Sequence, residues 1–385
     1  MKKIAFTGGG TGGHIYPGIA IADELRLKFA RENPGEDFEL VWIGNCAGMD
    51  KSIVEKSIGP DGKPSVDRFY GIPSGKFRRN FDLKNFIDIF KILAGIVASF
   101  FILLRLKPQL LFSKGGFVSV PPCLCAKILG IPVFTHECDF TPGLATRINS
   151  RSASKILISY QETRRFFSEK KQDNLVLTGN PVRPVFYQAD REKGFEFLGV
   201  KKENLSKPVL MVLGGSSGST QINKLVAQNI EWLTRHFFVV HQTGMYQDAS
   251  ISLENLSDDV KSCYRPYKFI YEQMPDVIAC ADIVLSRAGA NSLWECAVLK
   301  KPMILIPLCG RATRGDQVDN AAYFQRNGAA ITLNGSDVDS DHLKDSLKIM
   351  AQEQKLQECS AACGKILPAE KPAVIISNLL YNSLM

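Results

Sequence analysis

The sequence lacks the features that would place it among the disulfide-rich, zinc-binding or nucleic-acid-binding proteins. Its 10 cysteines form no CxxC pair, and the closest spacings are Cys123-Leu124-Cys125 and Cys359 with Cys363. Neither spacing belongs to a cluster suited to zinc, so we expect free thiols in a reducing cytoplasm and no bound metal. The basic residues form no dense block and no RNA-binding signature, which argues against a nucleic-acid partner.

The sequence also has no apolar run of the length that a membrane span requires. The uncharged stretch 92–104 is bounded by Lys91 and Arg105 at about 13 residues, whereas a spanning helix needs about 20. We therefore predict a buried helix there, next to a membrane-facing segment. The start of the chain, where Lys2 and Lys3 lead directly into a short strand and a glycine loop, does not have the pattern of a signal peptide.

The remaining composition is that of a two-domain globular protein. The 385 residues are 45% hydrophobic and 22% charged, and the net charge of +8 suits an anionic ligand or an anionic membrane surface. Short apolar runs alternate with helical patterns, which predicts parallel α/β sheets in both halves. The predicted strands cover residues 3–7, 39–43, 109–113, 132–135 and 155–159, then 209–213, 237–241, 282–286 and 303–307.

Each half opens with a strand, a glycine-rich turn and a helix. The turns are Gly8-Gly9-Gly10-Thr11-Gly12-Gly13-His14 and Gly214-Gly215-Ser216-Ser217-Gly218-Ser219. Glycines let the backbone approach a phosphate, and the first N–H groups of the following helix point at it. Two Rossmann-like domains are the simplest interpretation, and the boundary is predicted near Asn180-Pro181-Val182-Arg183-Pro184.

A nicotinamide-dependent oxidoreductase is a rival interpretation of the first turn. A dinucleotide site needs an acidic residue about 20 positions after the glycines, but Val41-Trp42-Ile43-Gly44-Asn45 ends the second predicted strand. The turn also lacks the GKS or GKT ending of a Walker A motif. A transferase is therefore favoured over a dehydrogenase.

A series of distinctive motifs follows in chain order. The motifs are Gly9-Gly10-Thr11-Gly12-Gly13-His14-Ile15-Tyr16-Pro17, Ser113-Lys114-Gly115-Gly116-Phe117-Val118-Ser119, His136-Glu137, Gly179-Asn180-Pro181-Val182-Arg183, Gly214-Gly215-Ser216, His241-Gln242-Thr243-Gly244, Ser286-Arg287-Ala288-Gly289-Ala290-Asn291-Ser292-Leu293-Trp294-Glu295 and Asp316-Gln317-Val318-Asp319-Asn320-Ala321. Together they resemble the motifs of the MurG family, the lipid-linked N-acetylglucosaminyltransferases of peptidoglycan synthesis.

The resemblance implies the α/β fold of GT-B type, in which two Rossmann-like domains with parallel sheets face each other across a cleft. It divides the chain into an acceptor and membrane-associating domain (residues 1–182) and a UDP-sugar-binding domain (residues 183–365). A C-terminal helix (residues 366–385) is expected to cross back to the first domain.

The implied reaction is an inverting transfer of N-acetylglucosamine from UDP-N-acetylglucosamine to the C4 hydroxyl of polyprenyl-diphosphate muramyl-pentapeptide, converting lipid I to lipid II. It needs no cofactor and takes place on the cytoplasmic face of the bacterial inner membrane, to whose anionic surface the protein binds peripherally. Two alternatives stay open: a GT-B transferase for another lipid, such as diacylglycerol, and the Rossmann oxidoreductase.

The resemblance also assigns a donor site. Ser216 and Arg183 are expected at the diphosphate, Glu295 at the ribose hydroxyls, Ile270 at the uracil through its backbone, and Gln317 at the sugar hydroxyls. The complete set is Thr11, Gly12, Gly13, Asp139, Arg183, Ser216, Ile270, Ala290, Asn291, Ser292, Glu295 and Gln317. Three positions depart from the family: Cys138 and Asp139 follow His136-Glu137 where the family usually has glutamine and asparagine, and Asp316 precedes Gln317 where many members carry another polar residue.

The acceptor diphosphate is assigned by the same resemblance to Gly10, Gly115 and Gly116. His14 is the candidate catalytic base, because the positive end of a helix dipole disfavours imidazolium and leaves a neutral ring that can accept a proton. Glu137 is the rival base.

The membrane-facing patch is expected within residues 76–90, where aromatic and basic side chains are mixed. Aromatic rings that enter the interface beside cations that meet anionic headgroups suit a peripheral protein. The predicted patch consists of Phe77, Arg79, Phe81, Phe86 and Phe90. The sequence Asp337-Val338-Asp339 matches the DxD pattern of metal-dependent transferases, but it precedes a helical pattern, so helix capping is favoured.

Overall fold

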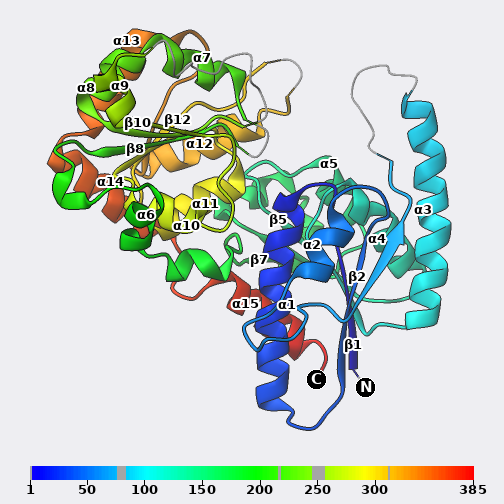
Figure 1. Cartoon of the computed structure of the whole chain (residues 1–385). Helices are drawn as coiled ribbons and strands as arrows, with labels where there is room; N and C mark the ends of the chain where they lie inside the picture. Colours follow the sequence, from blue (N-terminus) through cyan, green and yellow to red (C-terminus); the bar gives the residue numbers. More distant parts are fainter. Residues whose placement is uncertain (1, 76–83, 216–217, 245–255, 311–312) are drawn as a thin grey trace. The chain divides into compact units, whose positions relative to one another are not determined.

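The computed structural model describes residues 2–75, 84–215, 218–244, 256–310 and 313–385. The chain divides into two compact units, Met1–Arg183 with Pro368–Met385, and Pro184–Leu367 (Figure 1). The boundaries expected from the sequence, after residues 182 and 365, lie one and two residues before these divisions.

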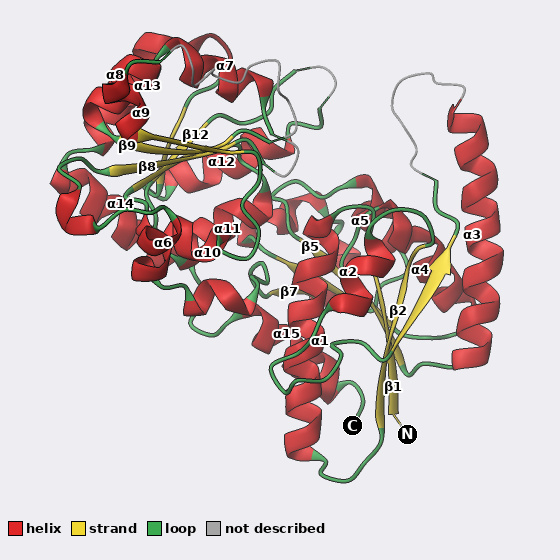
Figure 2. Cartoon of the chain, viewed as in Figure 1, coloured by secondary structure: helices red, strands yellow, loops and turns green. Residues whose placement is uncertain are grey.

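The first unit contains a seven-stranded parallel sheet in the order β3-β2-β1-β4-β5-β6-β7. Its central strands are apolar runs that are mostly buried, because helices pack on both faces of the sheet (Figure 2). The strands are β1 (Lys2–Thr7), β2 (Phe38–Asn45), β3 (Arg68–Ile72), β4 (Leu110–Ser113), β5 (Val133–Glu137), β6 (Lys155–Ile158) and β7 (Leu175–Leu177).

The helices of the first unit include one from each end of its chain, and these two lie side by side (Figure 1). Tyr381 of the last helix donates a hydrogen bond of 2.7 Å to Asn33 Oδ1, just after the first helix. The last helix begins at Pro372, where proline costs no intrahelical hydrogen bond. The helices are α1 (Gly12–Glu32), α2 (Asp50–Lys56), α3 (Lys84–Leu106), α4 (Val120–Ile128), α5 (Leu144–Asn149) and α15 (Pro372–Asn382).

The second unit repeats this architecture with a six-stranded parallel sheet in the order β10-β9-β8-β11-β12-β13. Its strands are β8 (Val209–Leu213), β9 (Phe238–Gln242), β10 (Tyr264–Tyr267), β11 (Ile283–Ser286), β12 (Met303–Leu305) and β13 (Ala330–Thr332). Two parallel sheets, one in each unit, confirm the predicted α/β class with two Rossmann-like domains.

The helices of the second unit cover both faces of this sheet (Figure 2). They are α6 (Arg191–Phe197), α7 (Thr220–Gln228), α8 (Ile230–His236), α9 (Asp258–Cys263), α10 (Met274–Cys280), α11 (Ala290–Val298), α12 (Asp316–Arg326), α13 (Ser340–Met350) and α14 (Glu353–Ile366). Short 3-10 helices occur in both units. In the first unit they cover Phe117–Ser119, Gln161–Phe166 and Glu169–Asn174, and in the second Pro184–Gln188, Lys202–Asn204 and Gly335–Asp337. Asp339 caps α13 by accepting the His342 N–H at 2.9 Å, so the capping role predicted for the DxD sequence is confirmed.

Helix α3 differs from its prediction. It has 23 residues, and its segment Asp88–Leu106 is long and apolar enough, by length and composition alone, to cross a membrane, although only 22% of that window is buried. Lys91 and Arg105 do not limit it, because an isolated charged side chain does not end a helix that packs on one face only. Leu103 and Ser99 are buried, whereas a stripe of apolar side chains at least 44% exposed runs along the helix: Phe86, Ile89, Phe90, Leu93, Val97, Phe101 and Leu104.

Candidate active site

The two glycine loops of the first unit follow β1 and β4, which are neighbours in the sheet. The chain continues in opposite directions from these strands, and such a switch point at the carboxyl ends of parallel strands is where α/β sheets bind ligands. The loops touch each other: a Cβ on Gly116 would lie 2.9 Å from the Gly9 carbonyl oxygen, and one on Gly10 would overlap the ring of Phe117. Both glycines have positive φ, so a side chain is excluded by strain as well as by space.

His14 lies in the first turn of α1 and reaches the second loop. Its Nδ1 atom is 3.3 Å from the backbone carbonyl oxygen of Lys114, and its ring packs against Gly116. A carbonyl can only accept a hydrogen bond, so in the neutral ring Nδ1 carries the proton and Nε2 keeps its lone pair. When the ring is neutral, Nε2 is therefore the nitrogen that can accept a proton.

Glu137, the rival base, is engaged by the loop that follows it. One carboxylate oxygen accepts the N–H of Asp139 and the other accepts the N–H of Gly143, each at 2.9 Å, and the residue is 4% exposed. These bonds shape the loop after β5 and use both oxygens. The geometry therefore favours His14 over Glu137 as the proton acceptor.

Among the described residues, one group has metal-ligand atoms within 4.8 Å of one another: Glu137, Cys138 and Asp139. These three residues are consecutive in one loop, and the Glu137 oxygens already accept backbone N–H groups. The Glu137 carboxylate serves to shape this loop, and we assign no ion to the group.

Two basic residues near the loops have positions that the sequence did not reveal. Lys114, which precedes the glycines of the second loop, is only 1% exposed, and its Nζ lies 3.5 Å from Asn180 Oδ1. Arg183 belongs to the first unit, where its guanidinium stacks 5.4 Å from the ring centroid of Tyr16 on α1. The assignment of Arg183 to the donor diphosphate remains a prediction.

In the second unit, candidate residues gather at the carboxyl ends of β8 and β11. Ser216 lies outside the described residues, but the glycines on either side, Gly215 and Gly218, have φ of +85° and +83°. Helix α11 starts directly after β11, has no side-chain cap and carries no acidic residue in its first turn. The amides of Ala290, Asn291 and Ser292, which have no acceptor within the helix, therefore form an N-terminus suited to a phosphate.

Glu295 and Gln317 lie on the two helices at this edge. Glu295 is half-buried on α11, whose other face is fixed by Trp294 packing edge-on against Phe324 of α12 at 5.9 Å. Gln317 Oε1 accepts the Leu308 N–H at 2.9 Å, which leaves its amide nitrogen to donate. Asp316 is paired with Arg314 at 3.2 Å, so its carboxylate, the departure noted in the sequence, is partly neutralised.

Ile270, the residue expected to read uracil through its backbone, is 2% exposed, and its N–H donates to the Gln242 side chain at 2.9 Å. Gln242 belongs to the motif His241-Gln242-Thr243-Gly244, for which the sequence indicated no role. In this motif, the buried His241 lies 2.9 Å from the Tyr264 hydroxyl and 3.1 Å from Asn223 Oδ1. Burial lowers the pKa of His241 to about 4, so the ring is neutral and holds β9, β10 and α7 together.

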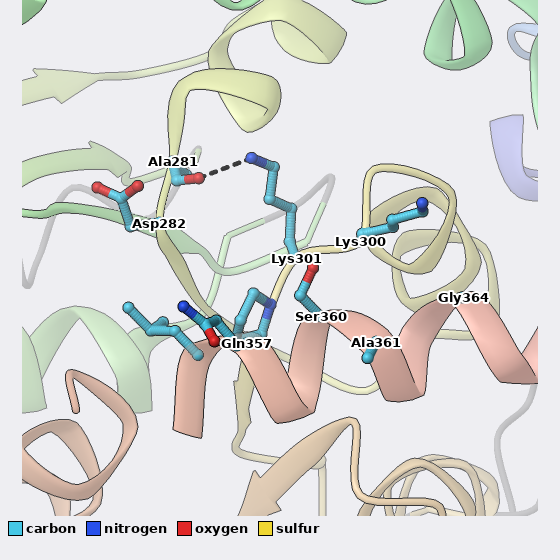
Figure 3. A pocket seen from close by; sticks show the side chains of 10 residues that line it. Ala281, Asp282, Lys300, Lys301, Gln357, Ser360, Ala361 and Gly364 are labelled. Carbon is cyan, nitrogen blue, oxygen red and sulfur yellow. Dashed lines mark hydrogen bonds between the residues drawn. The ribbon is translucent and has the colours of Figure 1, made fainter. Parts of the chain in front are cut away.

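A separate hollow of about 460 Å³ in the second unit lies at the amino ends of β11 and β12, bordered by α14 (Figure 3). The Lys301 ammonium group there donates to the carbonyl oxygens of Ala279 and Ala281 at 2.6 and 2.8 Å. Because open α/β sheets bind ligands at the opposite edge and the lysine is already bonded, we assign no substrate to this hollow.

Sequence and structure comparisons agree on the relationship of this chain to known proteins. Residues 4–158 match the glycosyltransferase family 28 N-terminal domain, and residues 209–373 match its C-terminal domain. A UDP-N-acetylglucosamine–N-acetylmuramyl-(pentapeptide) pyrophosphoryl-undecaprenol N-acetylglucosamine transferase from Treponema denticola is 49% identical, over 99% of this chain and 98% of its own length. A Bacillus cereus protein of the same name, numbered 2, is 38% identical over 98% of this chain and 99% of its own.

The crystal structure of Acinetobacter baumannii MurG has the same fold, with a TM-score of 0.72 and 21% identity, and covers 99% of this chain and 100% of its own. The resemblance inferred from the motifs is thus confirmed by identity along the whole chain. The chain belongs to glycosyltransferase family 28 and, within it, to the MurG family of N-acetylglucosamine transferases.

Proposed function

We propose that this protein transfers N-acetylglucosamine from UDP-N-acetylglucosamine to the C4 hydroxyl of lipid-linked muramyl-pentapeptide, the step of peptidoglycan synthesis that converts lipid I to lipid II. The relatives named for this reaction align with almost the entire chain. The structural observation that carries the proposal is the orientation of His14, whose Nδ1 faces the Lys114 carbonyl and whose ring packs against the second glycine loop.

The chemistry follows from these groups. His14 Nε2 takes the proton of the acceptor C4 hydroxyl while the C4 oxygen bonds to the anomeric carbon from the face opposite to UDP. The bond from the anomeric carbon to the UDP oxygen breaks, so the configuration inverts and the electron pair leaves with the diphosphate. The N-terminus of α11 at Ala290 and the guanidinium of Arg183 are proposed to stabilise that negative charge.

The donor is proposed to be held by the second unit. Glu295 accepts hydrogen bonds from the two ribose hydroxyls, Gln317 donates its amide to the sugar hydroxyls, and the segment at Ile270 meets the uracil. The acceptor diphosphate is proposed to lie at the loops of Gly115–Gly116 and at the start of α1. The Gly10 N–H already donates to Asp50, so a contact of Gly10 with this diphosphate would not involve that amide.

The protein is proposed to work at the cytoplasmic face of the plasma membrane, docked through α3. Its stripe of exposed phenylalanines and aliphatic residues is the surface that a polyprenyl acceptor requires, because the lipid does not leave the bilayer. Phe86 and Phe90 of the predicted patch belong to this stripe, being 67% and 61% exposed. Phe77, Arg79 and Phe81 lie outside the described residues.

The first experiment is transfer of radiolabelled sugar from UDP-N-acetylglucosamine to a short-chain lipid-linked muramyl-pentapeptide, in EDTA, with wild type and Glu295→Ala. We expect labelled disaccharide lipid from wild type and a roughly 100-fold loss of kcat/KM in the variant, because two hydrogen bonds to a charged group are lost. Glu231→Ala, at an exposed glutamate on α8, is the matched control and should behave as wild type.

Parallel assays with another acceptor, with a nicotinamide cofactor or with a divalent ion separate the alternatives. Product with diacylglycerol and none with the muramyl lipid would assign the protein to another lipid acceptor. Reduction of a nicotinamide cofactor in place of sugar transfer would favour the oxidoreductase. Activity that requires a divalent ion would contradict the metal-free mechanism.

A further inference from the structure

A carboxylate that the sequence did not single out lies directly behind the first glycine loop. Asp50, the first residue of α2, is 0% exposed. Its two oxygens lie 2.9 and 3.1 Å from the Gly10 nitrogen, and Oδ2 also accepts the N–H of Asn45, the last residue of β2, at 2.9 Å. One side chain therefore joins the loop after β1 to the end of the neighbouring strand.

The glycines of this loop are shaped around that carboxylate. A Cβ on Gly9 would overlap Asp50 Oδ2, and the other side of Gly10 is closed by the ring of Phe117 from the second loop. Gly10 is thus held between a charged group and an aromatic ring from two different segments. Because Asp50 occupies the Gly10 N–H, that amide is not available to a phosphate.

The position of His14 depends on the same contacts. Gly9 and the His14 ring both pack against Gly116, and His14 Nδ1 faces the Lys114 carbonyl. Only Thr11, Gly12 and Gly13 separate Gly10 from His14, so a shift of Gly10 moves the start of α1 and the imidazole with it. The bond from Asp50 to Gly10 is therefore part of what fixes the His14 ring relative to the second loop.

Asp50 remains in this place despite a cost. Burial raises the pKa of its carboxyl, and the N–H groups of Asn45, Gly10 and Asp50 itself oppose that shift. An apolar side chain would avoid the desolvation but would leave the half-buried Gly10 and Asn45 amides without this acceptor. The position thus requires a group that accepts several hydrogen bonds at once.

We propose that Asp50 is a positioning residue for the transfer reaction: its carboxylate holds Gly10 and so sets the place of His14 at the second glycine loop. The inference rests on the proposed function, in which His14 is the base. It implies that Asp50 affects turnover through His14 and leaves the donor site of the second unit unchanged.

The test is a double-mutant cycle with Asp50→Asn and His14→Ala, assayed with UDP-N-acetylglucosamine and the short-chain muramyl lipid. In the wild-type background we expect Asp50→Asn to lower kcat about 100-fold, the effect of a misplaced catalytic group, with the KM for the donor unchanged. In the His14→Ala background the same change should cost less than about 2-fold, because two residues that act as one unit are not additive.

A second variant and a control guard against a folding defect. Gly9→Ala forces a methyl group against Asp50 while the carboxylate is retained, and we expect it to reproduce the loss of kcat. Asp37→Asn, at an exposed aspartate just before β2, should behave as wild type. Binding of UDP-N-acetylglucosamine, measured by calorimetry, should be equal in all four single variants and the wild type.

An equal loss from Asp50→Asn in both backgrounds, or normal kcat in Asp50→Asn and Gly9→Ala, would overturn the positioning role while leaving the proposed function standing. No transfer by the wild type would overturn the proposed function itself, and this inference with it.

Discussion

His14 is the residue on which the proposed chemistry depends most directly. Replacing it with alanine should lower kcat by about 10²- to 10⁴-fold, the range of a lost general base, with both KM values within a few-fold of wild type. Glu137→Gln is the comparison, because it keeps one accepting oxygen for the loop amides. Steady-state kinetics with the muramyl lipid measure both. A larger loss of kcat in Glu137→Gln than in His14→Ala would reverse the assignment of the base.

At the scale of single residues, the sequence predicted which residues lie near one another, but it did not predict the hydrogen bonds that hold them. His14, Gly115 and Gly116 could be brought together from their motifs, since each follows a strand that a buried apolar run identifies. The bonds of Asp50 to Gly10 and of Gln242 to Ile270 could not. Both join a side chain to a backbone amide 40 and 28 residues away, and no local pattern encodes such a contact.

At the scale of elements, the apolar stripe of α3 gives a direct test of membrane docking. Phe90→Asp and Phe101→Asp each remove an exposed ring that is proposed to enter the interface. Burial of such a side chain is worth about 1.5–3 kcal/mol, so binding to anionic lipid vesicles should weaken about 10-fold or more. Co-sedimentation measures this binding. Ile349→Asp, at an exposed isoleucine on α13 of the second unit, is the control and should bind as wild type.

The kinetic consequence separates docking from catalysis. Both α3 variants should keep wild-type kcat with the short-chain acceptor in solution and lose activity only with long-chain lipid in vesicles. Unchanged vesicle binding by both variants would mean that the stripe has another partner.

The elements also explain where prediction from sequence ends. The apolar runs identified β1, β2, β4, β5, β6, β8, β9, β11 and β12, all of which have neighbours on both sides. The strands without such a run, β3, β7, β10 and β13, are the four edges of the two sheets. An edge strand is partly exposed, and β10 even contains Pro266, so its residues lack the continuous burial that produces a recognisable pattern.

For the whole molecule, a buried carboxyl in the first unit and a buried histidine in the second make opposite contributions to the pH dependence of stability. In the first unit, burial raises the pKa of Asp23 to about 6, helped by the nearby charges of Asp61 and Glu24 and opposed by Ser65 and Arg26. A raised carboxyl pKa stabilises the fold below about pH 4, and this contribution is lost as the pH rises through 6. Over that window the Asp23 carboxyl lowers the free energy of unfolding of the first unit by about 3 kcal/mol.

In the second unit the sign is reversed. The pKa of His241 falls from 6.5 to about 4 because of burial, so its contribution is complete above pH 6.5 and disappears as the pH drops through 4. The contribution of His241 to the free energy of unfolding is also about 3 kcal/mol. The buried His136 of the first unit also has a lowered pKa and contributes with the same sign as His241, so the effect of Asp23 is isolated through its own substitution.

The three tryptophans make this prediction measurable, because Trp42 lies in the first unit and Trp232 and Trp294 lie in the second. Thermal unfolding followed by fluorescence in Trp42→Phe, and in the double variant Trp232→Phe with Trp294→Phe, reports each unit separately. We expect Asp23→Asn to raise the transition temperature at pH 7 relative to that at pH 4.5 in the first profile only, and His241→Gln to flatten the second profile only. Parallel profiles that neither substitution alters would mean that these groups are already solvated in the folded protein, and that both units respond to pH through their surface charges alone.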